Sequence, residues 1–550
     1  MRSPLPARTI AASAVLLLLL RLAITVPAAK GADNLLAVAG DLKIPGGLCV
    51  QLGCDDLEPL VPLVRTGNYL VQVLDSREDA VSKARSDVYG QGLYGLLSVV
   101  QRSPREALPY AENLVNIVVV PADLADKATI SEIARVLCPG GVVLWQGNVD
   151  AVDFGQVGIE PLQNAGGWHA ARKPWPAAMD GWTHPRHAAD GNAVSQDTAV
   201  GPPRRVRWVA GPSVEISNMV TAAGRNYYGG VWTRDAFNGL RLWQRSLSPS
   251  PARGGFSFQY QAGSVRPVAA GDRLIVVTDG AVTALDGRTG ELLCTYAEAG
   301  KPAELLVVGD TLLTIDAATV RAVAMQKGDL RWKYDAAEPR YVVASDDAVF
   351  LMEGSPRRGE KPVAVSLAMV DGSVRWKQSE YAWLPAVRRS VIHGDRIALE
   401  VSTLNDTKEG NSIQVLSAGD GNLLFSRDFV PSMNHMKQAR AMFIDDLLWL
   451  LEDRQCVAVD ATTGEVKKTY KAGLCHCFPP VATRRFIFSG EMEMTDLATG
   501  EMDANRITKA ACGRDVGWVP ANGLVNVTPN HCVCWPMLRG YAALAPERPA

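Results

Sequence analysis

The residues best suited to chemistry are five cysteines near the end of the chain. Two Cys-x-Cys pairs flank a single cysteine: Cys475 and Cys477 in "GLCHCFPP", Cys512 in "ACGRD", and Cys532 and Cys534 in "NHCVCWP". In a β-strand, residues i and i+2 point to the same side, so each pair would present two sulfur atoms together. Such a cluster could form structural disulfides, a thiolate metal site that includes His531, or a redox-active thiol.

The sequence leaves these three alternatives open. Disulfides suit an exported protein, because an oxidising compartment preserves them. A Cys-x-Cys pair indicates a metal site less strongly than the Cys-x-x-Cys pair of a zinc ribbon. A redox-active thiol needs a neighbouring base or cation that lowers its pKa, and the sequence identifies none. The choice depends on where the chain resides and on which elements carry the cysteines.

The first 31 residues have the layout of an export signal. Two arginines precede an apolar run that ends at Leu20, and small residues follow it. We predict a signal peptide over residues 1–31, because the uninterrupted run is shorter than the roughly 20 residues that a membrane-spanning helix needs. We expect no membrane span after cleavage, and an exported protein of the periplasm or cell envelope.

Composition and charge bound the architecture and the class of partner. The chain has 550 residues, of which 47% are hydrophobic and 21% are charged, so it can bury enough apolar surface for at least two domains. Its formal net charge is -2, and it contains no long basic run. We therefore expect neither nucleic acid nor anionic lipid as a partner.

Residues 34–150 alternate strand-like and helical patterns. Short apolar runs such as "GGLCVQLG" and "NLVNIVVV" are typical of buried strands, and "ATISEIARVL" places Ile130, Ile133 and Val136 on one side of a helix. Strands that alternate with helices form a parallel sheet with helices on its faces. The pattern predicts a doubly wound, Rossmann-like α/β domain.

This stretch resembles a class I S-adenosylmethionine-dependent methyltransferase domain, most clearly in "EIARVLCPGGVVL". The resemblance implies a cofactor site in which Gly53 lets the ligand approach the backbone and Asp75 binds the ribose hydroxyls. The sequence departs from the family directly after Gly53, where Cys54, Asp55 and Asp56 stand in place of further glycines. The two acids also repel the carboxylate of that ligand. We therefore predict a degenerate site in which Gly53 is a turn glycine and Asp75 supports the start of a helix.

Residues 151–200 form the expected linker between two domains. They include a segment rich in proline, tryptophan, histidine and glycine, "GGWHAARKPWPAAMDGWTHPRHAADGN". His184 and His187 could line the entrance to the second domain, or they could form hydrogen bonds within the linker.

From residue 201 the chain repeats a short pattern around a glycine, as in "ALDGRTGELLC" and "AVDATTGEVKK". The aligned glycines are Gly239, Gly290, Gly328, Gly372, Gly421, Gly464 and Gly500. Their spacing of 36 to 51 residues is that of propeller blades. In most units an aspartate four residues before the glycine can accept hydrogen bonds from the amides of the turn. An aromatic residue four positions after the glycine, such as Trp243, would pack between neighbouring blades.

The two ends of this region complete one further blade. The segment around Trp208, "GPPRRVRWVAG", reads as an outer strand with no third strand before it. The segment around Ala543, "GYAALAP", reads as a third strand with no outer strand after it. Pairing them closes the ring and removes its open edges. We therefore predict an all-β, eight-bladed propeller over residues 201–550.

The repeat resembles the pyrroloquinoline quinone (PQQ) type, which occurs in quinoprotein alcohol dehydrogenases and in an outer-membrane assembly lipoprotein that binds no quinone. The whole chain is similar to bacterial exported PQQ-binding-like propeller proteins with a methyltransferase-like first domain. The repeat residues hold blades together and do not themselves contact a ligand. The adjacent Cys-Cys pair that the quinone enzymes typically carry does not occur in this sequence.

The same resemblance places cysteines at the positions of Cys477, Cys512, Cys532 and Cys534, so that Cys475 is an addition of this chain. These four positions fall in the last two blades and the closing strand. We predict that their sulfur atoms cluster where blades seven and eight meet, as disulfides or around a metal.

Three functions from different classes remain. We favour an exported binding or assembly protein whose propeller presents loops to a protein, a glycan or a small-molecule ligand. The second is an S-adenosylmethionine-dependent methyltransferase, which export opposes because that cofactor is made and kept in the cytoplasm. The third is a periplasmic quinoprotein-like or metal-dependent oxidoreductase with PQQ or a metal in the central channel. The sequence assigns none of these cofactors firmly.

Overall fold

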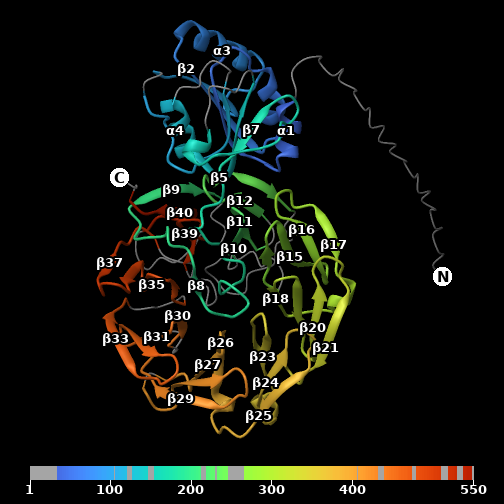
Figure 1. The fold of residues 1–550 in the computed structure, drawn as a ribbon, viewed down its shortest axis with the longest axis vertical. Helices are drawn as coiled ribbons and strands as arrows, with labels where there is room; N and C mark the ends of the chain where they lie inside the picture. The colour runs from blue at the N-terminus through green and yellow to red at the C-terminus, as the bar shows by residue number, and fades with distance from the viewer. Residues whose placement is uncertain are drawn as a thin grey trace, which may run out of the picture.

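The computed structural model places a smaller α/β domain on one side of a ring of β-blades (Figure 1). The described residues are 34–103, 106–120, 127–146, 154–211, 219–229, 232–245, 265–405, 407–431, 439–473, 479–508, 518–528 and 537–547. The predicted signal peptide, residues 1–31, lies outside these ranges. Within them, no helix is both long and apolar enough to cross a membrane.

The α/β domain contains one seven-stranded sheet in the order β3-β2-β1-β4-β5-β7-β6. Its strands are β1 (Gly47–Leu52), β2 (Tyr69–Asp75), β3 (Leu97–Gln101), β4 (Val115–Val120), β5 (Leu137–Trp145), β6 (Glu160–Pro161) and β7 (His169–Arg172). The first five pair in parallel, and β7 is antiparallel to β5 and β6. This arrangement confirms the predicted doubly wound domain. Its sheet continues through β6 and β7, which lie in the segment that the sequence analysis assigned to the linker.

Helices cover both faces of this sheet. They are α1 (Leu35–Asp41), α2 (Val61–Arg65), α3 (Glu78–Gly90) and α4 (Lys127–Val136), with 3-10 turns at Glu58–Leu60 and Phe154–Val157. One buried cluster joins α1, α2 and α3 to one face of the sheet, and a second joins α4 to the other face. α4 buries Ile130, Ile133 and Val136, the three residues whose spacing predicted a helix.

The ring consists of eight sheets, each with four blade strands, which confirms the predicted eight-bladed propeller (Figure 1). Blades one and two are β10 (Met219–Ala222), β11 (Arg225–Tyr228), β12 (Trp232–Asp235), β13 (Arg241–Gln244), and β14 (Val268–Ala270), β15 (Arg273–Thr278), β16 (Ala281–Asp286), β17 (Leu292–Thr295). Blades three and four are β18 (Glu304–Val308), β19 (Thr311–Ile315), β20 (Thr319–Ala324), β21 (Leu330–Asp335), and β22 (Arg340–Ala344), β23 (Ala348–Glu353), β24 (Val363–Ala368), β25 (Val374–Gln378).

Blades five and six are β26 (Val387–His393), β27 (Arg396–Val401), β28 (Ser412–Ser417), β29 (Leu423–Asp428), and β30 (Met442–Ile444), β31 (Leu447–Glu452), β32 (Gln455–Asp460), β33 (Val466–Lys471). Blade seven is β34 (Val481–Thr483), β35 (Phe486–Ser489), β36 (Glu493–Asp496) and β37 (Met502–Ala504), and β8 (Val194–Ser195) adds to its inner edge. Blade eight is β38 (Val519–Ala521), β39 (Leu524–Val527), β40 (Tyr541–Ala545) and β9 (Arg205–Ala210). Further 3-10 turns are Ala297–Ala299, Pro356–Arg358 and Leu384–Ala386.

Blade eight joins the two ends of the propeller as the sequence predicted. β40 and β9 are antiparallel, and Ala543 lies directly opposite Trp208. The ring is therefore closed by backbone hydrogen bonds between strands that are more than 300 residues apart in the sequence. This closure leaves no open sheet edge at the seam.

Consecutive blades are joined by aromatic side chains that lie against turn glycines. A Cβ atom on Gly421, whose φ is +74°, would lie 2.7 Å from the indole of Trp376 in the preceding blade. The corresponding distances are 2.8 Å for Gly290 and Trp243, 2.6 Å for Gly372 and Trp332, and 2.5 Å for Gly464 and Phe425. The Trp376 indole N–H also donates to the Ala418 carbonyl at 2.9 Å. The glycine therefore serves both the turn and the contact between blades.

A segment of the expected linker runs around the centre of the propeller and contacts all eight blades. We call residues 180–197 the belt. In chain order its hydrogen bonds to the blades join Trp182 to Thr221, Thr183 to Ala269, His184 to Val307, Ala189 to Ala344, Asp190 to Ile392, Asn192 to Phe443, Ala193 to Ala482, and Asp197 to Gly523. These partners lie on the first strand of blades one to seven and in the first turn of blade eight. The belt therefore forms hydrogen bonds with backbone groups of the first strand in blades one to seven and of the first turn in blade eight.

The belt closes on itself through one carboxylate. Asp180 Oδ2 accepts a hydrogen bond from the Gln196 amide at 2.7 Å and from the Ser195 hydroxyl at 3.3 Å. His187 Nε2 lies 2.8 Å from the same oxygen. The Asp180 amide also donates to Asp197 Oδ2 at 3.1 Å. The first and last residues of the belt are thus held together, and the propeller has a second closed ring inside the first.

The α/β domain docks on the propeller through the amino-terminal ends of its parallel strands. Asn116, at the start of β4, donates to the buried Asp235 carboxylate of blade one at 2.7 Å and accepts from Asn238 Nδ2 at 2.7 Å. Glu112 forms ion pairs with Arg205 at 2.8 Å and Arg207 at 2.7 Å, both on β9. The carboxyl ends of β1 and β2 consequently face away from the propeller (Figure 1).

Candidate functional site

The sequence directs attention first to the carboxyl ends of β1 and β2. Gly53 follows β1 directly, and its φ of +88° lies in the region that favours glycine. Its amide donates to the Leu74 carbonyl at 2.7 Å, so the turn is fastened to the neighbouring strand β2. The Gln51 side chain fixes the rest of the loop by donating to the carbonyls of Gly53 and Asp56, at 3.0 and 2.8 Å. The loop is therefore held by its own chain.

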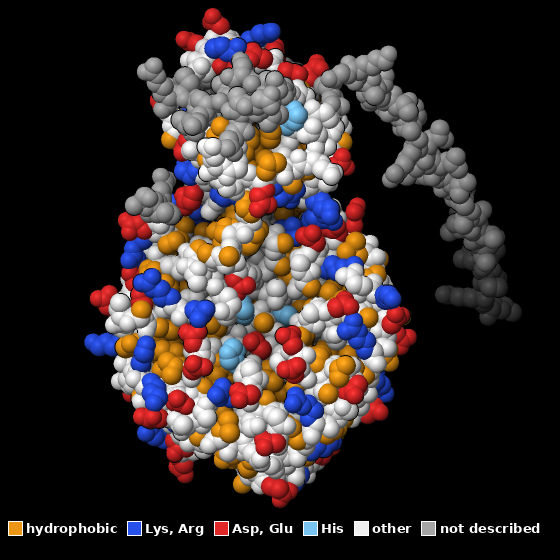
Figure 2. Space-filling view, in the orientation of Figure 1, with side chains coloured by type: hydrophobic (Ala, Val, Ile, Leu, Met, Phe, Trp, Pro, Cys, Tyr) orange, Lys and Arg blue, Asp and Glu red, His pale blue; other side chains and the backbone are white. Residues whose placement is uncertain are grey.

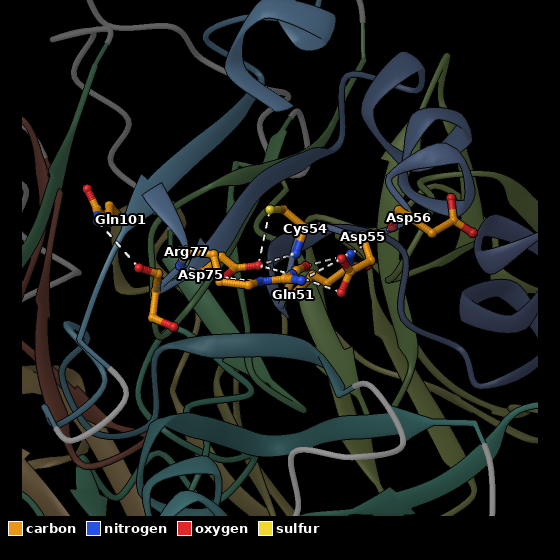
Figure 3. A network of polar contacts seen from close by, with 9 residues as sticks. Gln51, Cys54, Asp55, Asp56, Asp75, Arg77 and Gln101 are labelled. Atoms are coloured by element: carbon orange, nitrogen blue, oxygen red, sulfur yellow. Dashed lines mark hydrogen bonds and ion pairs between the residues drawn. The ribbon is translucent and has the colours of Figure 1, made fainter. Parts of the chain in front are cut away.

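The Asp75 carboxylate, at the end of β2, is surrounded by donors from the same domain (Figure 3). Its Oδ1 accepts from the Arg77 amide at 2.9 Å and from Arg77 Nε at 3.1 Å. Its Oδ2 accepts from Arg77 Nη2 at 2.6 Å, from the Cys54 amide at 2.9 Å and from the Cys54 thiol at 3.1 Å. Arg77 also pairs with Asp55 at 2.8 Å. The arginine therefore neutralises both acids of the loop.

These contacts set the protonation states of the site. The Arg77 guanidinium, and to a lesser degree the hydrogen bonds from Cys54, hold the pKa of Asp75 well below its usual range despite burial. Burial, followed by the neighbouring Asp75 carboxylate, raises the pKa of the Cys54 thiol to about 12. At neutral pH, Asp75 is consequently ionised and Cys54 is a protonated donor. A thiol in this state is a poor nucleophile.

The Asp75 site does not fit S-adenosylmethionine. A carboxylate offers about four acceptor positions, and five donors from Arg77 and Cys54 already address this one. Ribose hydroxyls would have to displace a bidentate arginine, which is among the stronger polar contacts in proteins. Residues 121–126, which follow β4 in the sequence, lie outside the described residues. We therefore derive no methyl-transfer step at Asp75.

The two belt histidines form hydrogen bonds within the propeller. His184 is 3% exposed, and its Nε2 accepts from the Val307 amide at 2.9 Å. Its Nδ1 lies 2.8 Å from the Thr183 hydroxyl, which makes it the protonated nitrogen of a neutral ring. Burial, and secondarily the charge of His187, lowers the pKa of His184 to about 3. His184 is therefore a neutral structural side chain, and His187 is the partner of Asp180 described above.

A cavity of about 650 Å³ lies between the belt and the inner strands of blades three to five. The belt contributes His184, Arg186 and Gly191 to its wall, and the blades contribute Arg340 and Arg389. Figure 2 shows histidine and acidic side chains gathered over the middle of the propeller face. The cavity has the size of a small-molecule site. Sequence analysis did not single out either blade arginine, because each lies at a strand irregularity that no motif marks.

The late cysteines and their candidate partner lie outside the described residues. These are Cys475, Cys477, Cys512, His531, Cys532 and Cys534. The predicted cluster at the junction of blades seven and eight therefore stays a prediction. Among the residues that the structure describes, no three histidine, cysteine, aspartate or glutamate side chains are grouped as metal ligands. Of the described cysteines, Cys49, Cys54, Cys138 and Cys294 are free thiols.

Comparison with known families identifies the propeller. A family described as outer membrane protein assembly factor BamB, of the PQQ-like repeat type, matches residues 186–366 and 318–473. Together these matches span more than half of the chain. The chain belongs to this family. Its propeller is thus PQQ-like, and the domain that precedes the matched region is methyltransferase-like in fold.

Solved structures give two kinds of similarity. The chain is similar to quinohemoprotein alcohol dehydrogenase from Comamonas testosteroni, with 13% identity over 68% of this chain and 82% of that one, at a TM-score of 0.43. It is also similar to a SAM-dependent methyltransferase from Aquifex aeolicus, with 17% identity over 25% of this chain and 89% of that one, at a TM-score of 0.21. A search of curated proteins found no match.

The described residues at the centre of the propeller do not fit PQQ as a stacked cofactor. The belt runs around the channel and forms hydrogen bonds with the first strand of blades one to seven and the first turn of blade eight, so its atoms line the channel. Among the described residues that line the remaining cavity, the aromatic side chains are Tyr341 and His184, and His184 is buried in its own contacts. The described part of the wall therefore offers a planar quinone at most the Tyr341 ring as a stacking surface. We therefore derive no step through PQQ.

Proposed function

We propose that the protein is an exported binding or assembly protein whose propeller serves as a rigid platform for a protein, glycan or small-molecule ligand. The observation that carries this proposal is the double contact of Arg77 with Asp75, at 2.6 and 3.1 Å. Arg77 thereby occupies the Asp75 carboxylate, which a methyltransferase of this fold would use to bind its cofactor. The first domain then serves as a docking module attached to the propeller.

The construction of the propeller supports a platform. The strand pairing of blade eight and the belt fasten the ring twice, and Asn116 and Glu112 fix the first domain to it. Rigid binding surfaces lose little conformational entropy on association, so a doubly closed ring is well suited to present loops. The description of the family, an outer membrane protein assembly factor, agrees with such a role. Export is part of the proposal, and fractionation of the cells that make the protein tests it.

The first experiment asks whether the first domain binds S-adenosylmethionine. We expect no heat of binding in calorimetry at about 1 mM cofactor, which corresponds to less than about 4 kcal/mol of binding free energy. Asp75→Ala, which removes the carboxylate, should leave this result unchanged. Saturable micromolar binding that Asp75→Ala abolishes would restore the methyltransferase function.

The second experiment asks whether one face of the propeller binds a partner in the cell envelope. Benzoylphenylalanine replaces Asp310, in the exposed turn between β18 and β19, or Asp279, in the exposed turn between β15 and β16 at the other face. We expect discrete cross-linked species from one position and not from the other. The absence of a discrete species from both positions would contradict an assembly role.

A further inference from the structure

The inner strands of blades four and five differ from the other inner strands of the described propeller. The pairing of β22 with β23 shifts register between Arg340 and Val343, and the pairing of β26 with β27 shifts between Val387 and Arg389. The first and second strands of the other six blades pair without such a shift. Bulges redirect side chains and are frequent beside functional sites. Here they occur at Arg340 and Arg389, two of the arginines that line the cavity beside the belt, which we call the belt cavity.

The backbone at this point is also strained. Glu338 and Tyr341 flank Arg340 with φ values of +49° and +52°, which non-glycine residues seldom adopt. The Ser390 hydroxyl donates to the Tyr341 carbonyl, so the bulge of blade five is tied to that of blade four. Strain of this kind persists when the surroundings enforce it, and it is concentrated at binding and catalytic sites. The two bulges that carry Arg340 and Arg389 are thus fastened to each other by a strained local structure.

Both arginines have buried donors without a partner in the described structure. Arg389 Nη2 donates to the Gly191 carbonyl at 2.8 Å, but its Nη1 is buried and unbonded. Arg340 Nη2 donates to the Gly354 carbonyl, while its Nε is buried and unbonded. A buried donor without a partner destabilises the fold, and more so when it is charged. An acceptor in the cavity would remove that destabilisation.

Most of the acidic side chains that line the cavity already form ion pairs with arginines. Asp316 pairs with Arg321 at 2.5 Å, and Glu338 pairs with Arg358 at 2.6 Å. The remaining acid of the wall, Glu304, faces Arg266. Since Arg186 also lines the cavity, positive charge exceeds negative charge there.

The charged residues near Arg389 do not neutralise its guanidinium. Asp190, Glu400 and Arg440 act on it electrostatically, and the Glu400 carboxylate accepts from the amides of Ala439 and Arg440, at 2.9 and 3.1 Å. Burial, followed by the charge of Arg440, lowers the pKa of Arg389 to about 9. The guanidinium therefore stays charged at neutral pH.

We propose that the belt cavity binds a small molecule through a carboxylate or phosphate group, which accepts hydrogen bonds from Arg340 and Arg389. The wall also contains Leu305, Leu306 and Val342, so the ligand has an apolar body next to its anionic group. Arginine suits such groups because its planar fork matches their oxygens. This inference rests on the proposed binding function and names the ligand class of its channel.

Calorimetry on the full chain tests this site with two probes, succinate and inorganic phosphate. Sodium chloride of equal ionic strength is the blank. We expect saturable binding of at least one probe with a Kd below about 10 mM. Arg340→Gln and Arg389→Gln should each weaken it about tenfold, because each removes a charge-assisted hydrogen bond. Which probe binds more tightly distinguishes a carboxylate ligand from a phosphate ligand.

Arg388→Gln is the matched control. Arg388 is the extra residue of the bulge in blade five, next to Arg389. Its Nε donates to the Ser402 carbonyl at 3.0 Å, and it does not line the cavity. This variant should bind the probe with unchanged affinity. If Arg389→Gln does not fold, the affinity of Arg340→Gln for the probe decides whether the site exists. No binding of either probe at about 10 mM, or equal affinity in Arg340→Gln and the wild type, would overturn the site. Neither result would affect the cross-linking test of the binding function.

Discussion

The indole of Trp376 occupies the space in which a side chain on Gly421 would have to lie. A Cβ atom there would be 2.7 Å from the ring, and the φ of +74° adds a separate cost for any other residue. Gly421→Ala should therefore lower the free energy of unfolding by about 2–5 kcal/mol, the sum of the two penalties. Urea unfolding measures the change.

Gly394→Ala separates these two penalties. Gly394 lies in another turn of the same blade, with a φ of +57°, and a Cβ atom there meets nothing within 4 Å. This variant should cost only the conformational term, about 1–2 kcal/mol. Equal losses in the two variants would show that the contact between blades adds nothing to stability.

The side chain of Asn192, in the belt, forms two hydrogen bonds with the backbone of one blade residue. Its side chain donates to the Phe443 carbonyl and accepts from the Phe443 amide, both at 2.9 Å, and it is 4% exposed. Asn192→Ala leaves two buried backbone groups without partners and should lower the free energy of unfolding by about 2–4 kcal/mol. Gln196→Ala, an exposed amide in the same belt, should change it by less than about 0.5 kcal/mol. If both variants are equally stable, the belt does not brace blade six.

The contact between the two domains should depend on pH through Glu112. Burial alone would raise the pKa of Glu112, but hydrogen bonding to Arg205 and the charge of Arg207 outweigh it and lower this pKa to about 2. Because the pKa is lower in the folded state, the ion pairs stabilise the protein fully above the ordinary pKa near 4.5 and lose this effect as the pH falls through about 2.

Glu112→Gln isolates this contribution. At pH 7 the variant should be less stable than the wild type by about 1.5–3 kcal/mol, the range for hydrogen bonds to charged groups. The difference should shrink steadily between about pH 5 and pH 2. Unfolding curves for both proteins across this range measure it, and a difference independent of pH would contradict the ion-pair account.

The repeat pattern was sufficient to predict the propeller, because the constraints on each blade are local. The turn glycine, the aspartate before it and the aromatic residue after it, as in Asp235, Gly239 and Trp243, are read from residues a few positions apart. The pairing of Trp208 with Ala543 is not local, yet it follows from counting strands at the two ends.

The belt could not be predicted from the sequence in the same way. Its bonds join residues such as His184 and Val307, which are far apart in the chain and follow no period. Polar composition made it read as a linker. The short strands β6 and β7 were missed for a related reason, since two to four residues give too little alternation to recognise.

The site near Gly53 was recognisable only in part. The sequence indicated the turn and the two acids after it, but it did not assign a role to Arg77, which decides whether Asp75 is available. The one available signal was the spacing of Asp75 and Arg77, two residues apart at the end of a strand. Arg340 and Arg389 gave no signal, since a bulge depends on pairing with another strand.

The last prediction concerns the cysteines at the seam of the ring. Cys477, Cys512, Cys532 and Cys534 belong to the last two blades by sequence, where the propeller is closed without covalent continuity. We expect their sulfur atoms to be joined or to share a ligand, and a disulfide there would contribute about 2–4 kcal/mol by restraining the unfolded chain. A reductant should then lower the unfolding temperature, whereas a chelator should not. The opposite pattern would assign a metal, with ligand bonds that the chelator removes. Cys475→Ser is the control, since this cysteine has no counterpart in the resemblance and should leave the reductant response unchanged. If neither reagent changes the unfolding temperature, the four cysteines are ordinary small side chains of the core.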